Sequence, residues 1–440
     1  MSEGNDAAGG APDGAAGDDR PASNRSAPGR EPADARPRPD APATDLRVLT
    51  DALAAADADA FVAVGDRFDD DLRYLTRFAG PDRDFALVVT PETATLCAPT
   101  LFAEQAEREF AAAAPPAESG DLDRRVETGT AGDPAGERAA AVVTERAGEE
   151  SAVLVPQSIP HDAAVYLEQA GHAITSTDAV AVARERKEPD ELECLRRVQR
   201  ATARGMARAE TVLAESQVGA ESGPGDDAEP VLVWEGGPLS TERLRRQVNA
   251  TLAAYGVRDA GNTVIGAGPS AADLHYTGVD LVRPGETVLL DLSPRGPHGY
   301  YGDMTRTFVV EGEGGWERRA YVAVRAAREA ALAEVEPGAT AATVHEEAAA
   351  ELAAHGFDPT AGEGEAGFTH GTGHGVGVSL HEGPSLSAAT ELRPGHVVTV
   401  EPGVYDPETG GVRLEDLVAV TEDGYEILHE YPLGSVPERR

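Results

Sequence analysis

The chain contains few cysteines, lysines and aromatic residues. Its 440 residues include two cysteines, one lysine and 37 arginines, and aromatic side chains make up 5% of the total. Cys97 and Cys194 are too few and too far apart for a disulfide framework or a zinc knuckle, so we expect both to be small buried side chains. Lys187 has no glycine loop around it and no Gly-x-Ser-x-Gly segment is present. The sequence therefore lacks a phosphate-loop lysine and that kind of serine nucleophile.

Positive charge and long apolar runs are also scarce. With 38 basic and 77 acidic residues the formal net charge is −39, which argues against nucleic acid or an anionic membrane as a partner. No stretch is long and apolar enough to span a bilayer, and the N-terminus lacks the basic and apolar regions of a signal peptide. We therefore expect a cytoplasmic protein.

Most of the acidity lies outside the N-terminal tail. Residues 1–44 hold eight acids and five arginines, so this acidic tail carries a net charge of only −3 and about −36 remains for the rest of the chain. The tail has almost no large apolar residue and is predicted to be disordered. Molar salt shortens the Debye length to about 3 Å and screens such self-repulsion, so the composition is typical of a halophile. GC-rich codon bias explains the preference for arginine over lysine, but it does not explain the excess of acidic residues.

The length of the chain predicts two domains. Residues 45–185 alternate between strand and helix patterns, which predicts an α/β domain with helices covering a sheet. A helix is expected around Leu101–Ala113, and the expected strands are Ala60–Val64, Phe85–Val89, Thr93–Ala98 and Ser151–Val155. In residues 186–440, two helices followed by a β-hairpin occur twice, which predicts a pseudo-symmetric repeat. The four helices expected there are 188–216, 241–255, 316–335 and 340–355, with a polar insertion at 219–230.

Two aspartates lie beside apolar segments. Asp291 ends Thr-Val-Leu-Leu-Asp, Asp303 precedes Met-Thr-Arg-Thr-Phe-Val-Val, and a loop rich in Pro and Gly lies between them. This pattern predicts a β-hairpin with one aspartate on each strand. A carboxylate at such a place needs a cation or a hydrogen-bond donor. Taken alone, the pair could equally cap the turn or bind Arg306.

Three histidines, at positions 370, 374 and 381, fall within twelve residues. Glycine alternates at 371, 373, 375 and 377, so a strand here would place His370, Thr372 and His374 on one face. Glycine at this density marks the close approach of a ligand or another backbone. The pattern favours a functional site over isolated structural histidines.

Two glutamates follow at the ends of strand-like segments. Glu401 precedes a Pro-Gly turn, and Arg413 and Glu415 share a face of a second predicted strand at 412–420. Either glutamate could be an ordinary ion-pair partner, which is the reading we favour for Asp416. Four carboxylates and one imidazole have the charge and the mainly oxygen ligands that suit two divalent cations; they are Asp291, Asp303, His374, Glu401 and Glu415.

In this order the segments resemble the pita-bread metallopeptidases, which include proline dipeptidases (prolidases), aminopeptidase P and methionine aminopeptidase. The resemblance covers residues 190–435 and rests on His275-Tyr, Asp291, Asp303-Met-Thr-Arg-Thr, His370-Gly-Thr-Gly-His374-Gly-Val-Gly, His381-Glu, Glu401-Pro-Gly-Val-Tyr and Arg413-Leu-Glu415-Asp. Residues 72–78 resemble a segment of the N-terminal domain of prolidases, aminopeptidase P and creatinase. The implied fold is a creatinase/prolidase-like α/β domain followed by a pita-bread catalytic domain, and the implied assembly is a homodimer.

The resemblance also implies roles for single residues. Asp291 matches a bidentate ligand of one metal, Asp303 and Glu415 match bridging carboxylates, and His374 and Glu401 match ligands of the other metal. Manganese is the expected metal, with cobalt and zinc as alternatives. The implied reaction is hydrolysis of an Xaa-Pro bond at the N-terminus of a dipeptide or short peptide. The implied catalytic residues are His370, His381 and Glu401, and the implied substrate-binding residues are His275, His381 and Arg413.

One spacing departs from the family pattern. Asp291 and Asp303 are twelve positions apart, one more than in the family, and Ser293 stands where the family has glycine. We expect a three- or five-residue tip or a bulge to absorb the extra residue, with Gly296 and Gly299 supplying positive φ.

Other functions remain as alternatives. The additional N-terminal domain disfavours a methionine aminopeptidase, and the complete ligand set disfavours both a creatinase-like amidinohydrolase and a non-catalytic peptide-binding relative. Arg413 could bind the carboxylate of a dipeptide or form a structural ion pair. The sequence leaves open the native metal, the preferred first residue, the peptide length and the choice between dipeptidase and aminopeptidase.

Overall fold

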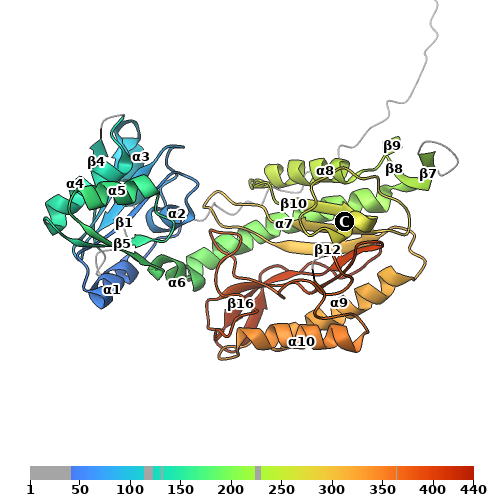
Figure 1. Ribbon diagram of the computed structural model, residues 1–440. Coiled ribbons are helices and arrows are strands. Elements are labelled where there is room, and N and C mark those ends of the chain that lie inside the picture. Colours follow the sequence, from blue (N-terminus) through green and yellow to red (C-terminus); the bar gives the residue numbers. More distant parts are fainter. Residues whose placement is uncertain (1–40, 113–121, 130–131, 223–228, 363) are drawn as a thin grey trace, which may run out of the picture. The chain divides into compact units, whose positions relative to one another are not determined.

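The computed structural model describes residues 41–112, 122–129, 132–222, 229–362 and 364–440. Between residues 60 and 177 the chain forms a six-stranded mixed sheet (Figure 1). Its strand order is β4-β3-β2-β1-β5-β6, with β2 antiparallel to both neighbours and the other pairs parallel. The strands are β1 (Ala60–Gly65), β2 (Phe85–Val89), β3 (Thr93–Pro99), β4 (Asp123–Gly129), β5 (Ala152–Pro156) and β6 (Ala173–Thr177).

Alternation along the central strand buries both faces of this sheet. In β1, Phe61 and Ala63 face a core shared with α1 (Arg47–Ala56) and α2 (Asp70–Thr76). The intervening residues Ala60, Val62 and Val64 face a second core shared with α4 (Ala135–Ala147) and α5 (His161–Gln169). Two helix layers therefore cover the sheet, as the predicted α/β alternation requires.

The strands predicted in this half are confirmed, and the helix predicted around Leu101–Ala113 is confirmed as a helical segment over Thr100–Ala111, although Ala113 lies outside the described residues and the helix type changes along the segment. The chain there forms a 3-10 turn (Thr100–Phe102), α3 (Ala103–Ala106) and a π-helical turn (Glu107–Ala111). Leu101 is 87% exposed and only Ala106 and Phe110 are fully buried, so the apolar residues do not form one continuous buried stripe.

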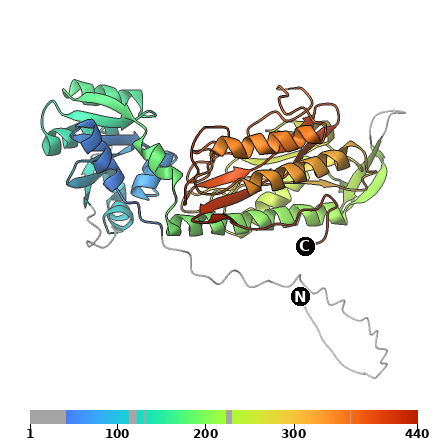
Figure 2. The ribbon, with the colours of Figure 1, turned by 90° about the horizontal axis from the view of Figure 1, so that it is seen from below.

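The second half contains the predicted twofold arrangement. Helices α7 (Pro189–Glu215) and α8 (Thr241–Ala254) share a core with the antiparallel sheet β10-β11-β12. Helices α9 (Trp316–Ala333) and α10 (Ala341–Ala354), which lie side by side in Figure 2, share another core with the sheet β13-β16-β17. The strands are β10 (Thr263–Ala267), β11 (Thr287–Leu292), β12 (Met304–Val309), β13 (Val397–Val400), β16 (Asp416–Thr421) and β17 (Gly424–Ile427).

Smaller elements complete this half. Strands β14 (Gly403–Asp406) and β15 (Gly410–Arg413) pair with each other, and β8 (Glu229–Trp234) pairs with β7 (Gln217–Ser222) and β9 (Gly237–Pro238). The predicted polar insertion thus begins and ends in paired strands, while residues 223–228 lie outside the described part.

The two halves are joined by helices rather than by a long linker. Helix α6 (Ala179–Glu185) ends just before α7, whose first turn is fixed by Pro189 and by a capping box between Glu188 and Glu191. Residues 39–440 form one compact unit, so the domain boundary near residue 185 stays a prediction. Residues 1–40 of the predicted tail lie outside the described part, but Thr44 is buried and its hydroxyl donates to the carbonyl of Tyr74.

Candidate metal centre

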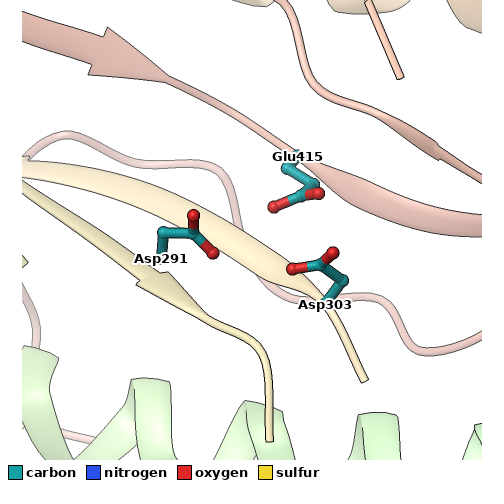
Figure 3. A group of neighbouring side chains, drawn as sticks. All are labelled: Asp291, Asp303 and Glu415. Carbon is teal, nitrogen blue, oxygen red and sulfur yellow. The ribbon is translucent and has the colours of Figure 1, made fainter. Parts of the chain in front are cut away.

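Three carboxylates from separate segments face one another in the second half (Figure 3). Asp291 lies near the end of β11, Asp303 directly precedes β12, and Glu415 lies between β15 and β16. One oxygen of each lies within 4.8 Å of the others, and Asp303 and Glu415 are buried. Such a group of oxygen donors could hold a hard or borderline metal ion.

The hairpin between the aspartates has a tip of the predicted kind. Asp291 is opposite Thr305, and the bridge between Arg295 and Tyr301 keeps the same register. Five residues, 296–300, lie between Arg295 and Tyr301, so the prediction of a three- or five-residue tip is confirmed. Gly299 has the expected positive φ of 96°, whereas Gly296 is not among the residues with positive φ. The extra residue is therefore absorbed in the hairpin tip, and Arg295 makes a further bridge to Arg258.

Hydroxyl groups hold the carboxylates in place. Ser293 Oγ donates to Asp303 Oδ1 at 2.9 Å and lies 3.4 Å from Asp291 Oδ1, and Thr305 Oγ1 donates to Glu415 Oε2 at 2.7 Å. Burial and the neighbouring negative charges raise the pKa of both Asp303 and Glu415 well above their usual range. The cluster is therefore an unfavourable place for several negative charges unless cations neutralise them.

His374 and Glu401 extend the cluster. His374 Nε2 lies 3.4 Å from Glu401 Oε1 and 3.9 Å from Asp303 Oδ2. His374 Nδ1 is 3.1 Å from the carbonyl of Gly375, which assigns the proton to Nδ1 and leaves the Nε2 lone pair facing the carboxylates. Burial lowers the pKa of His374 to about 4 and raises the pKa of Glu401 to about 7.

The histidine segment is not the predicted strand, because residues 369–378 make only isolated bridges. The prediction that glycine marks close backbone approach is confirmed: a Cβ at Gly373 would lie 2.0 Å from the carbonyl oxygen of Thr399. Thr372 is buried and its hydroxyl lies 2.9 Å from His345 Nδ1 of α10. The expectation that Thr372 shares a face with His370 and His374 is therefore wrong.

The second predicted strand is broken at the carboxylate. Residues 410–413 form β15 and residues 416–421 form β16, so Glu415 lies in the interruption. Asp416 accepts a hydrogen bond from Arg306 and also pairs with Arg328, which confirms its assignment as an ion-pair partner. Since Arg306 pairs with Asp416, the alternative that it binds the two aspartates is wrong.

Arg413 links the carboxylates to a tyrosine and a histidine. Its Nη2 donates to Asp291 Oδ2 at 2.5 Å, its Nη1 donates to Tyr405 Oη at 3.0 Å, and its Nε donates to Thr305 Oγ1 at 3.1 Å. Tyr405 Oη in turn lies 2.7 Å from His370 Nε2. Burial, followed by the charge of Arg413, lowers the pKa of His370 to about 3, so this ring is neutral at physiological pH.

One cavity of about 410 Å³ brings together all nine residues singled out in the sequence. They are His275, Asp291, Asp303, His370, His374, His381, Glu401, Arg413 and Glu415. The rings of His374 and His381 meet edge to face at 4.3 Å. The roles of Ser293, Thr305 and Tyr405 were not predicted, although Thr305 and Tyr405 lie within the segments that carry the resemblance.

A buried ion cluster lies beside the histidine segment. Glu382, next to His381, accepts hydrogen bonds from Arg184 Nη2 at 2.8 Å and from Lys187 Nζ at 2.5 Å. The side chain of Lys187 is 1% exposed and that of Glu382 is 7% exposed. The backbone of Glu382 also exchanges two hydrogen bonds with Gly375. The cluster, which was not predicted, ties the segment carrying His374 and His381 to residues 184–187.

The fold and the site were compared with known proteins. The prolidase from Pyrococcus horikoshii has the same fold, with a TM-score of 0.71 and 22% identity over 89% of this chain and 99% of that chain. The sequence pattern of metallopeptidase family M24 matches residues 193–422. The chain therefore belongs to the metallopeptidase family M24.

Two curated relatives are similar in sequence. The probable dipeptidase PepE of Mycobacterium bovis is 35% identical over 176 residues, which are 39% of this chain and 45% of that protein. The Xaa-Pro dipeptidase of Pyrococcus furiosus is 36% identical over 170 residues, which are 38% of this chain and 47% of that protein. The chain thus spans about half the length of these relatives. In the described part of the chain, no helix combines the length and the apolar composition that a membrane span requires.

Proposed function

We propose that this chain is a two-metal exopeptidase that cleaves Xaa-Pro bonds at the N-terminus of dipeptides or short peptides. One observation carries the proposal: the five candidate ligands line one cavity, with three carboxylates within 4.8 Å of one another. Membership of family M24 supports the metallopeptidase class. The similarity to a protein named Xaa-Pro dipeptidase supports the substrate class.

The charges in the cavity fit two divalent cations. Four carboxylates line it, and Arg413 is the only arginine or lysine among its lining residues in the described part of the chain. The donor set is mainly oxygen with one imidazole nitrogen, which suits manganese, with cobalt or zinc as alternatives. When bound, such ions polarise a peptide carbonyl and acidify water. The ligands would be Asp291, Asp303, His374, Glu401 and Glu415.

Side chains of the cavity are suited to the proton transfer and to the stabilisation of the oxyanion. Glu401, whose pKa burial raises to about 7, is suited to accept a proton from water and pass it to the leaving nitrogen. Both ring nitrogens of His370 already have partners, the carbonyl of Gly371 and the hydroxyl of Tyr405. His381 also lines the cavity, so it is the better placed of the two to donate to a developing oxyanion.

Arg413 serves as a positioning residue in this proposal. Its three nitrogens donate to Asp291, Tyr405 and Thr305, and the residue is 3% exposed. A buried guanidinium with a partner on each of its three nitrogens is a poor receptor for the carboxylate of a dipeptide. The structural alternative for Arg413 is therefore favoured, and His275 remains the proposed substrate contact at the wall of the cavity.

The test is an assay on purified, manganese-loaded protein with Xaa-Pro dipeptides, Xaa-Pro-Yaa tripeptides and a Met-Ala peptide. We expect cleavage of the proline substrates. The ratio of the rates on Xaa-Pro dipeptides and on Xaa-Pro-Yaa tripeptides distinguishes a dipeptidase from an aminopeptidase. Asp303→Asn should lose both metal and activity, whereas Asp51→Asn, an exposed position on α1, should lose neither. Preferred cleavage of Met-Ala, or full activity of Asp303→Asn, would contradict the proposal.

The proposed setting is the cytoplasm of a salt-loving organism, with the chain acting as a homodimer. About −36 of formal charge outside residues 1–44 supports adaptation to salt. Sedimentation in 2 M and 0.2 M KCl tests the assembly: a monomer at both concentrations would contradict it.

A further inference from the structure

A second cavity, of about 350 Å³, is lined by four arginines and by no acidic residue of the described part of the chain. It shares no lining residue with the cavity that holds the carboxylates. In a chain with twice as many acids as bases, four arginines around one cavity without a lining carboxylate are unexpected. The four are Arg67, Arg73, Arg258 and Arg295.

Two of these arginines are held in place at the inner wall. Arg295 is 6% exposed, and its guanidinium donates to the carbonyl of Gly299 at 2.7 Å and to Asp70 at 2.7 Å. Arg73 is half-buried and donates to the carbonyls of Arg77 and Pro297 at 3.1 and 3.0 Å. Both side chains are therefore fixed before any ligand arrives, which lowers the entropy cost of binding.

Gly299 brings the two side chains together. Its φ is +96°, and a Cβ at this position would lie 3.2 Å from Cγ of Arg73 and 3.5 Å from Nη2 of Arg295. Burial, with Arg77 and Arg295 nearby, lowers the pKa of Arg73 to about 10. Arg295 is paired with Asp70, so the uncompensated positive charge of the inner wall is that of Arg73, which makes no ion pair with a carboxylate of the described residues.

The other two arginines lie at the mouth of the cavity. Arg67 and Arg258 are exposed, and neither makes an ion pair with a carboxylate of the described residues. The backbone of Arg258 exchanges hydrogen bonds of 3.0 and 2.8 Å with that of Arg295, which anchors its position at the rim. Unpaired guanidinium groups around a concave site are the usual means by which proteins recognise phosphate.

We propose that this cavity binds the phosphate group of a small molecule, either free phosphate or a phosphomonoester. Arg73 and Arg295 form the floor of the site, and Arg67 and Arg258 close over the bound anion. Three of the remaining lining residues, Gly296, Pro297 and Gly299, belong to the segment that joins Asp291 to Asp303. Binding therefore stabilises the segment that separates the two aspartates of the carboxylate cluster.

The experiment is calorimetric titration of the full, metal-loaded chain at constant ionic strength with inorganic phosphate, glycerol 3-phosphate and sulfate. We expect one equivalent of phosphate-bearing ligand to bind. If inorganic phosphate binds more tightly than glycerol 3-phosphate, the ligand is free phosphate; if glycerol 3-phosphate binds more tightly, the ligand is a phosphomonoester. Arg67→Gln/Arg258→Gln should weaken binding about tenfold or more, since hydrogen bonds to charged groups are lost. The matched control is Arg325→Gln, an exposed arginine on α9 that pairs with Glu329, and it should bind as the parent does.

Four outcomes would overturn the proposal. Unchanged affinity in the double variant shows that the anion binds elsewhere, and an equal loss in Arg325→Gln shows a general effect of net charge. Loss of phosphate binding in Asp303→Asn, with the double variant unaffected, assigns the anion to the metal centre. A double variant that changes only its sedimentation coefficient assigns the four arginines to a contact between two copies of the chain.

Discussion

Replacing Glu382 should destabilise the protein more than replacing its partner Lys187. Glu382→Gln removes the carboxylate that is paired with the ammonium of Lys187, whose side chain is 1% exposed, and leaves it only neutral hydrogen-bond acceptors such as the carbonyl of Glu185 at 3.1 Å. A buried charge that loses its partner costs about 3–5 kcal/mol. Lys187→Met leaves Glu382 paired with Arg184, so only one charged hydrogen bond is lost, at about 1.5–3 kcal/mol.

The double variant measures whether the losses of stability in the two single variants are coupled. Lys187→Met/Glu382→Gln removes both charges and no longer strands the ammonium, so its loss of stability should be at least about 1 kcal/mol smaller than the sum of the two single losses. Urea unfolding at constant KCl concentration measures all four proteins without changing the ionic strength. Equal losses in the two single variants, or simple additivity in the double variant, would refute the reasoning.

The remaining predictions concern rate, salt and pH. His381→Ala should retain both metals but lose about a hundredfold or more in kcat, since His381 is the proposed oxyanion donor, and loss of metal here with His374→Ala unaffected would reverse the ligand assignment. Activity and Tm should rise together toward molar KCl, and deletion of residues 1–44 should leave this dependence unchanged; equal melting curves in 0.1 and 2 M KCl contradict the assignment to a halophile. Burial lowers the pKa of His396 from its usual value to about 4, so the unfolded chain protonates first as the pH falls, and stability should decrease from about pH 6.5 to 4. His396→Asn should flatten this decrease in thermal unfolding across that range, and an unchanged slope would exclude the histidine as its cause.

The sequence predicted which residues surround the carboxylate cluster because each lies beside a clear local pattern. Asp291 ends an apolar strand, Asp303 begins the next, and Glu401 precedes a Pro-Gly turn. These patterns depend on neighbouring residues alone, and the nine chosen side chains line one cavity. Their assignment to metal, catalysis or substrate remains a prediction.

The backbone between these residues was harder to predict. The tip of the hairpin has a predicted length, but Arg295 at its base also makes a bridge to Arg258, a partner that no local pattern indicates. The alternating glycines resembled a strand, yet their role is to admit the backbone of Thr399 and its neighbours. The contact between Lys187 and Glu382 joins residues 195 positions apart, so short-range periodicity contains no information about it.

The burial of Lys187 decides how the folded protein reacts with amine-directed reagents. The chain has one lysine, and its ammonium is held by Glu382 with the side chain 1% exposed. An acylating reagent can modify this ε-amine only after the contact has opened. The labelling rate of Lys187 under folding conditions therefore reports how often the segment beside His381 detaches, and it does so without any engineered probe.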